Sequence, residues 1–92
     1  MRLDLFLKTS RLVKRRGQAK TLCDAGRVRV DGLPAKAARQ VRVGNRIALD
    51  LDRRQVVVEV RELPAAVVGR GEAWRLYTVV EERVSLQGMA GR

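Results

Sequence analysis

Apolar residues near the start of the chain recur every three or four positions, a spacing that predicts a short helix. Leu3, Phe6 and Leu7 share one face of this helix and should contribute to the core. Thr9 and Ser10 have side chains that favour turns and caps, so we expect the helix to end there.

A second helix is predicted from residues 14–15 to Ala25, because an apolar stripe precedes Gly26, which suits a left-handed C-terminal cap. The stripe consists of Ala19, Leu22 and Cys23. On the first helix, Asp4 and Lys8 have the i, i+4 spacing of a surface ion pair. The two helices should pack together through their apolar faces.

After Gly26 the apolar period changes to two, which is typical of β-strands. In residues 27–30 the valines should face inward and the arginines outward. Asp31 and Gly32 then predict a two-residue hairpin, and Pro34 restricts the returning strand to an edge or an irregular segment.

Further strands are predicted downstream. Val41–Arg46 is predicted as a strand that enters a turn, residues 47–51 alternate, and Val56–Leu63 forms a long strand. Residues 64–71 are predicted to be a loop, and Trp74–Val80, rich in aromatic and β-branched residues, is predicted to be a strand. The pattern therefore indicates an α+β fold, with two short N-terminal helices, an antiparallel meander, a further C-terminal strand and a flexible tail.

The charge of the chain is confined to one half. The 92 residues carry a formal net charge of +10. Residues 1–46 contain 13 basic and three acidic side chains, whereas residues 47–92 contain seven of each. A chain of this length forms one domain. The asymmetry indicates a basic half, residues 1–46, that binds a polyanion, and a neutral half that supports it.

Composition excludes several classes of site. The chain has no histidine and a single cysteine, which excludes an internal disulfide, a Ser–His–Asp triad and the usual zinc sets, and Cys23 is expected in the core. No apolar run approaches the roughly 18 residues that span a bilayer. Charged residues also interrupt any candidate signal peptide. We expect a cytoplasmic protein that is not an enzyme and needs neither metal nor cofactor.

The candidate polyanion-binding residues surround the junction of the two helices. Between Lys8 and Lys20 there is no acidic residue, so the basic groups there can cover one convex surface and contact phosphates. The N-terminus of the second helix would add N–H donors. The alternative is a solvated face that serves solubility, in which acidic residues would normally be interspersed. The candidates are Arg2, Arg11, Lys14, Arg15, Arg16 and Lys20.

Other arginines leave more than one interpretation open. Arg39, Arg42 and Arg46 either extend this basic surface or decorate loops. Arg27 and Arg29 should point outward from a strand, where they either contact RNA or form part of a solvated face.

The aromatic residues favour folded RNA over single strands as the partner. Proteins that read single strands stack bases on several exposed aromatic side chains. Phe6 is the one aromatic residue of the basic half, and the helix face needs it inside. Trp74 and Tyr77 are predicted to pack in the core or against the sheet. Recognition of phosphates and shape, on ribosomal RNA helices or tRNA, is therefore expected.

The order of these features resembles one family, the RNA-binding domain first described in ribosomal small-subunit protein four. Arg2–Lys8 and Ser10–Arg16 carry the resemblance, together with Ala19, Leu22, Gly26, Val28, Val30 and Gly32. The turn at residues 43–47 is similar to the family's Gly-Asp turn, with Asn45 in place of Asp. The resemblance implies that the two helices pack on a small, bent antiparallel sheet and that the helical face meets structured RNA.

The Met-Arg start, the Val-rich strand and the segment Leu76–Thr78 also resemble a narrower family, that of ribosome quality-control protein P. This family is related to the small ribosome-associated heat-shock proteins. The resemblance implies binding to the rRNA of the large ribosomal subunit and to peptidyl-tRNA, while a nascent-chain tailing factor adds a C-terminal tail. It covers a single RNA-binding domain over residues 1–82. We expect residues 83–92 to be a flexible tail, and the chain to be a monomer without membrane contact.

Several alternatives stay open. A heat-shock-type factor would bind free large subunits that carry a nascent chain, although such relatives tend to have a longer basic C-terminal extension. Another small accessory protein for tRNA or rRNA would share the same surface. The chain could also be the detached RNA-binding portion of a pseudouridine synthase or an aminoacyl-tRNA synthetase. Its 92 residues leave no room for the catalytic domain of such an enzyme. Adhesion to an anionic membrane would need longer amphipathic helices.

Overall fold

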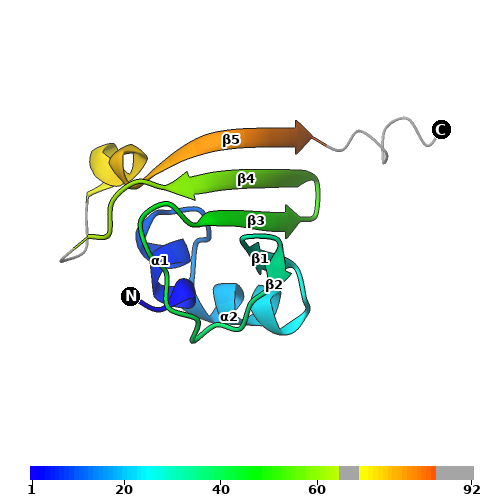
Figure 1. Cartoon of the computed structure of the whole chain (residues 1–92). Coiled ribbons are helices and arrows are strands. Elements are labelled where there is room, and N and C mark those ends of the chain that lie inside the picture. Colours follow the sequence, from blue (N-terminus) through cyan, green and yellow to red (C-terminus); the bar gives the residue numbers. More distant parts are fainter. Residues whose placement is uncertain (65–68, 85–92) are drawn as a thin grey trace.

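The computed structural model describes residues 1–64 and 69–84, which form two short helices and a five-stranded antiparallel sheet (Figure 1). The helices are α1 (Leu3–Thr9) and α2 (Arg16–Asp24), and a 3-10 helix, η1 (Arg70–Leu76), precedes the last strand. The strands are β1 (Val28–Val30), β2 (Leu33–Pro34), β3 (Arg46–Leu51), β4 (Arg54–Val60) and β5 (Tyr77–Val84). Their order is β2-β1-β3-β4-β5, and Figure 1 shows the helices near β1 and β3 while β5 lies at the far edge. The predicted α+β class is confirmed.

Local sequence signals define the ends of both helices. The first helix ends at Thr9 as predicted, and the second begins at Arg16. Gly26 adopts a φ of 76° beyond α2 and donates to the Cys23 carbonyl at 3.0 Å. The N–H of Arg27 donates to the Leu22 carbonyl at 3.0 Å, which completes a Schellman motif.

The predicted hairpin forms at Asp31 and Gly32, whose φ angles of 52° and 85° match a type I′ turn. Val30 pairs with Leu33 across it. The Asp31 carboxylate also accepts hydrogen bonds from Asn45 Nδ2 at 2.8 Å and from the Arg46 N–H at 2.9 Å. The hairpin is thereby tied to the turn that leads into β3.

The core lies between the helices and the inward face of β1, β3 and β4. As the alternation predicts, the inward positions of these strands are at most 2% exposed: Val28, Val30, Ile47, Leu49, Val56, Val58 and Val60. Leu3, Phe6 and Leu7 of α1 are fully buried against the same cluster. The helix pair is therefore fixed to the sheet by apolar burial, the dominant favourable contribution to folding.

The predicted strand over Val41–Arg46 is wrong. Most of this segment is a turn, because Gly44 adopts a φ of 95° and the side chain of Asn45 accepts a hydrogen bond from the Arg42 N–H at 2.7 Å. Its strand character begins at Arg46. The long strand predicted over residues 56–63 is shifted, since β4 spans Arg54–Val60.

The segment before β5 differs most from prediction. It contains η1, in which Ala73 and Leu76, three residues apart, are 6% and 0% exposed. The intervening Trp74 is 70% exposed, so its predicted place in the core is wrong. The strand begins only at Tyr77, which is partly buried. Of the tail expected over residues 83–92, the first two residues belong to β5 and the rest lies outside the described residues.

Candidate nucleic-acid interface

The N-terminal segment is held against the loop that follows β2. The N–H of Leu3 donates to the Arg39 carbonyl at 2.8 Å, and the N–H of Asp4 donates to the Ala37 carbonyl at 3.1 Å. Arg2 pairs with Gln40 in an antiparallel bridge. This contact joins segments more than 30 residues apart and aligns the backbone of Arg39 and Gln40 with that of Leu3 and Arg2, which the sequence pattern did not predict.

Asp4 links two of the candidate binding residues. Its carboxylate is buried, and it accepts from Arg2 Nε at 3.2 Å, from Arg2 Nη2 at 3.3 Å and from Arg16 Nε at 3.2 Å. It also accepts from the N–H of Leu5 at 2.8 Å, within the first turn of α1. The predicted ion pair with Lys8 is wrong, because Asp4 points toward the two arginines instead.

The pKa of Asp4 reflects this arrangement. Burial by itself would raise the pKa, but the hydrogen bonds from Arg2 and Arg16 and the charge of Arg16 outweigh it. The pKa of the carboxyl therefore lies below its usual 3.8, and Asp4 is ionised at neutral pH. The guanidinium groups stay about half exposed, at 46% and 48%, so their outer edges face solvent.

The connection between α1 and α2 carries three more candidates, Arg11, Lys14 and Arg15, all of them exposed. Arg11 adopts a φ of 63°, a left-handed conformation that usually favours glycine. Its N–H donates to the Lys8 carbonyl at 3.1 Å. A cationic side chain therefore occupies a position where the backbone alone would select glycine.

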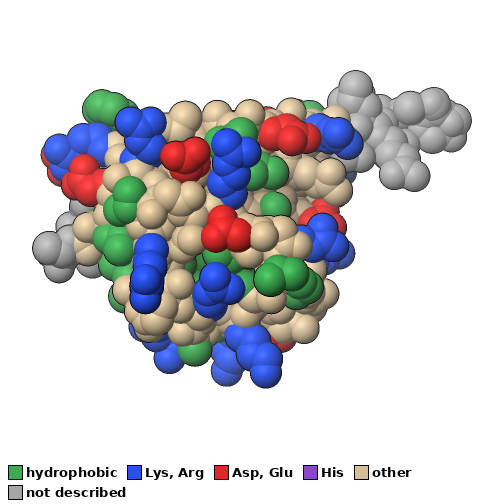
Figure 2. Space-filling view, viewed as in Figure 1, with side chains coloured by type: hydrophobic (Ala, Val, Ile, Leu, Met, Phe, Trp, Pro, Cys, Tyr) green, Lys and Arg blue, Asp and Glu red, His purple; other side chains and the backbone are tan. Residues whose placement is uncertain are grey.

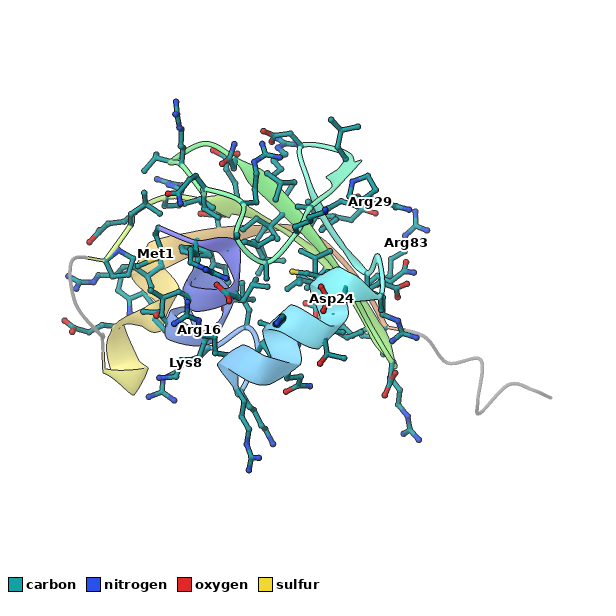
Figure 3. The ribbon with its side chains drawn as sticks, turned by 90° about the horizontal axis from the view of Figure 1, so that it is seen from below. Met1, Lys8, Arg16, Asp24, Arg29 and Arg83 are labelled. Carbon is teal, nitrogen blue, oxygen red and sulfur yellow. The ribbon has the colours of Figure 1, made fainter. Side chains whose placement is uncertain are left out.

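The N-terminus of α2 lies within this basic region. Arg15 is the N-cap residue and makes no side-chain cap hydrogen bond, and the first turn, all of it described, contains no acidic residue. Lys20 follows Arg16 by one helical turn and is exposed. Figure 3 shows this side of the molecule, with Arg16 and Lys8 near each other beside the two helices. We call the six exposed cations Arg2, Arg11, Lys14, Arg15, Arg16 and Lys20 the helix-pair surface.

The two halves of the chain differ in how many of their described cations form ion pairs. Four of the 13 cations in residues 1–46 have a carboxylate within 4.0 Å, which leaves nine without one among the described residues. Of the described side chains in the second half, Arg54, Arg75 and Arg83 are paired, whereas Arg53 and Arg61 are not. Figure 2 shows Lys and Arg projecting from the lower edge near α2, while they alternate with Asp and Glu across the strands.

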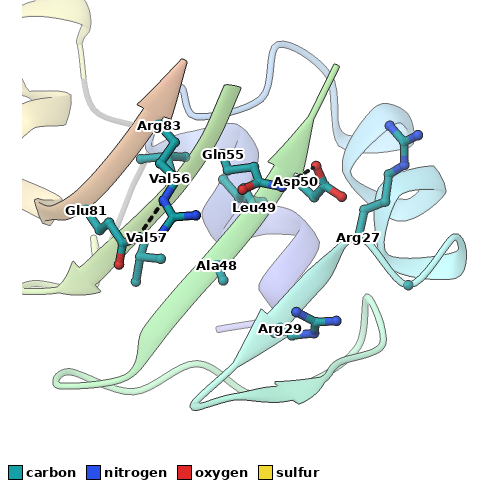
Figure 4. A pocket seen from close by; sticks show the side chains of 11 residues that line it. Arg27, Arg29, Ala48, Leu49, Asp50, Gln55, Val56, Val57, Glu81 and Arg83 are labelled. Carbon is teal, nitrogen blue, oxygen red and sulfur yellow. Dashed lines mark hydrogen bonds and ion pairs between the residues drawn. The ribbon is translucent and has the colours of Figure 1, made fainter. Parts of the chain in front are cut away.

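The outward face of the sheet has a different character. It contains a hollow of about 270 Å³ lined by Arg29, Asp50, Gln55, Glu81 and Arg83, among others (Figure 4). Arg83 pairs with Glu81 at 3.3 Å, and Gln55 donates to Asp50 at 3.5 Å. Because Asp50 and Glu81 line it together with the arginines, and Glu81 pairs with Arg83, this hollow is a weaker anion site than the helix-pair surface.

Other chemistries find little support in the described part of the chain. Cys23 is buried, and burial together with the negative charges of Asp4 and Asp24 raises its pKa to about 11, so the thiol is protonated and poorly nucleophilic at neutral pH. Within residues 1–64 and 69–84 no group of three or more His, Cys, Asp or Glu side chains could hold a metal ion. None of the described helices is long and apolar enough to cross a bilayer.

Comparison with known proteins identifies the family. The model of the S4 domain family matches residues 1–47, the part of the chain that contains the helix-pair surface. The chain belongs to the S4 domain family. The chain is also 42% identical, over 82 residues, to the RQC P-site tRNA stabilizing factor of Bacillus subtilis, covering 89% of this chain and 94% of the relative. The factor of the same name from Halalkalibacterium halodurans is 43% identical over 82 residues, which are 89% of this chain and 92% of the relative. Within the S4 domain proteins, the chain therefore belongs to the family of these factors.

A solved structure is similar over most of the fold. It is the trimeric structure of Heat Shock Protein 15 from Vibrio cholerae, with a TM-score of 0.81 and 28% sequence identity. The similarity covers 87% of this chain and 81% of that protein. This likeness confirms the arrangement of two helices on a small antiparallel sheet.

Proposed function

We propose that this S4 domain protein is a non-enzymatic RNA-binding factor that binds rRNA of the large ribosomal subunit and tRNA during quality control of stalled nascent chains. The relatives that cover nine-tenths of the chain are named RQC P-site tRNA stabilizing factors, and we extend that role to this chain. Such a role takes place on ribosomes in the cytoplasm. The observation that carries the proposal is the set of cations without carboxylate partners, concentrated where the S4 family model matches.

The proposed mechanism is electrostatic clamping of two RNA backbones. Arginine forms planar, bidentate contacts with phosphates, and lysine adds mobile positive charge. Arg2 and Arg16 are anchored on Asp4 with their outer edges exposed, so part of the entropy cost of ordering them is met before RNA binds. Arg11, Lys14 and Arg15 would contact a second stretch of backbone from the connection between the helices. A tRNA held beside rRNA in this way is biased toward one position.

The six residues of the helix-pair surface are the proposed RNA contacts, and Lys36 and Arg39 are added to them. The backbone ladder between the N-terminal segment and the loop after β2 supports this addition, since it brings the loop alongside Arg2. Lys36 and Arg39 are exposed and have no carboxylate partner among the described residues. Peptidyl-tRNA and a nascent-chain tailing factor are the further partners that we propose.

A heat-shock-type role on free large subunits is the second candidate, and the structural likeness to Heat Shock Protein 15 favours it. The higher identity to the P-site tRNA stabilizing factors, 42% against 28%, favours the first role. We further propose that the chain acts as a monomer, which size-exclusion chromatography with light scattering would test directly.

Sucrose-gradient sedimentation of the tagged protein with bacterial ribosomes tests the proposed function. We expect the protein to co-sediment with large subunits rather than with small subunits or intact ribosomes, and the bound large subunits to carry tRNA. Binding only to large subunits that carry no tRNA would contradict a role in tRNA positioning. Failure to sediment with any ribosomal particle would contradict the ribosomal role altogether.

A further inference from the structure

Trp74 is the most exposed large aromatic side chain of the described structure, and neither the helix-pair surface nor the core uses it. Trp74 is 70% exposed, although burial of its indole would contribute a large favourable free energy. Its neighbours in η1 hold it firmly, because Ala73 and Leu76 on either side of it are buried. The short 3-10 helix therefore presents the indole outward from a fixed backbone.

A hollow of about 420 Å³ lies beside this indole, and its lining combines aromatic faces with positive charge. We call it the indole hollow, lined by Arg61, Glu62, Trp74, Arg75, Tyr77 and Thr78. Arg61 Nη1 donates to Thr78 Oγ1 at 3.0 Å, and Arg75 Nη2 lies 3.2 Å from Glu72 Oε1, so both guanidinium groups are positioned. The volume is sufficient for one nucleobase with its sugar.

The indole hollow and the helix-pair surface lie at the same end of the molecule. Figures 1 and 3, which view the molecule from directions 90° apart, both show η1 at the same end of the molecule as α1. In Figure 3, Lys8 lies on the side of α1 that is nearest η1. An RNA bound along α1 would therefore lie at the end of the molecule that carries η1 and the indole hollow.

We infer that Trp74 and the indole hollow bind an unpaired nucleobase of the RNA held by the helix-pair surface. The inference rests on the proposed RNA-binding function and adds a site to it. Base–aromatic stacking needs an exposed aromatic face, and nearby arginine adds cation–π and phosphate contacts. A protein partner would instead favour a hollow whose centre is depleted of charge, whereas three of the six lining residues here are charged. Folded RNA supplies such bases in its loops, bulges and ends.

The single tryptophan of the chain makes the test direct, because its fluorescence reports on this site alone. The probes are one RNA hairpin in three forms: blunt, with a single-stranded overhang of six adenosines, and with an overhang of six abasic nucleotides. The abasic overhang has the same phosphates and lacks only the bases. Adenine is chosen because its amino group offers a donor to Glu62. Each overhang is placed on the 5′ or the 3′ end in turn.

We expect the adenosine overhang to quench Trp74 fluorescence and to bind about five- to 100-fold more tightly than the abasic overhang. Trp74→Ala should abolish this advantage, whereas Trp74→Phe should retain much of it, because Phe still stacks. Both variants should fold, since the side chain is largely exposed. Equal affinity for the two overhangs and unchanged fluorescence would overturn the inference, while salt-dependent binding of the blunt hairpin would leave the proposed function intact. Absence of binding by all three hairpins would instead contradict the proposed function.

Discussion

The two halves of the chain are both rich in arginine, and they differ in what those arginines contact. In the C-terminal half, strand pairing brings opposite charges together, as where Arg54 of β4 meets Glu82 of β5 at 3.3 Å. In the N-terminal half, the single buried carboxylate of Asp4 serves two arginines, and nine other cations have no carboxylate partner among the described residues. The number of arginines therefore says less about binding than the number of arginines without partners.

Apolar packing explains how one small domain supports both arrangements. The inward apolar residues of β1, β3 and β4 are buried in one cluster with α1, so apolar burial, and not the surface charges of the helix pair, supplies most of the stability of the fold. Cations without partners repel one another and cost some stability at low salt. That cost is consistent with a surface used for binding.

Charge reversal should reveal the largest difference in RNA affinity between the two halves of the chain. Lys14→Glu with Arg15→Glu removes two unpartnered cations of the helix-pair surface, and we expect affinity for folded RNA to fall about 100-fold. The matched control is Arg53→Glu with Arg83→Glu, which changes the net charge by the same amount in the neutral half, away from the indole hollow. We expect the control to change affinity by about twofold, because exposed charges far from the ligand are screened. Equal losses in both variants, measured by filter binding, would mean that net charge alone controls the affinity.

Replacement of the buried Asp4 carboxylate separates two effects on RNA affinity. The change in net charge predicts tighter binding, whereas the loss of the anchor for Arg2 and Arg16 predicts weaker binding. Asp4→Asn raises the net charge, so electrostatics alone predicts tighter RNA binding. We expect weaker binding, by about three- to tenfold, because Arg2 and Arg16 lose their anchor and must be ordered by the RNA itself. Measurement of affinity at one salt concentration, with circular dichroism to confirm the fold, decides between the two. Tighter binding by the variant would show that Asp4 does not position the arginines.

The stability contributed by Asp4 should depend on pH in a defined direction. Its folded-state pKa is lowered, so the carboxylate stabilises the fold above the usual pKa of 3.8, and this contribution is lost as the pH falls through the lower folded value. At pH 7 we expect Asp4→Asn to reduce the free energy of unfolding by about 1 kcal/mol, since both arginines are half exposed. Urea unfolding at pH 7 and at successively lower pH values below 3.8 measures this. A difference between wild type and variant that is as large in acid as at neutral pH would exclude this ion-pair contribution.

The smallest effect is expected from a cation of the neutral half. Arg53→Ala should change RNA affinity by less than about twofold, because the side chain is exposed in the β3–β4 turn, outside the helix-pair surface. A strong loss in the same binding assay would contradict the division of the chain by halves.

Local sequence patterns predicted most of the helices and strands, but they did not predict the contacts between segments that are distant in the sequence. Gly26 and the Asp31-Gly32 pair fixed the helix end and the hairpin, since their backbone conformations are encoded by the residues themselves. The anchor between Asp4 and Arg16 depends on how two helices pack, which periodicity does not specify. The same holds for the ladder that aligns the loop after β2 with Arg2.

The segment before β5 could not be predicted for a related reason. Trp74 is a bulky aromatic residue of the kind that is usually buried in a strand. In η1, however, Ala73 and Leu76 are the buried residues, and Trp74 faces outward. The candidate surface was easier to predict, because a run of basic residues without acids is visible in the sequence. Its separation into anchored and unanchored arginines required the structure.

The salt dependence of affinity for a folded RNA hairpin tests most directly whether the helix-pair surface neutralises phosphates. If about six phosphates are contacted, log affinity should fall with log salt concentration at a slope of about −4 to −5. The Lys14→Glu, Arg15→Glu variant should show a slope that is shallower by about two, and the Arg53→Glu, Arg83→Glu control should keep the wild-type slope. A wild-type slope near zero, or an equal change in both variants, would contradict RNA binding by the partnerless cations of the N-terminal half.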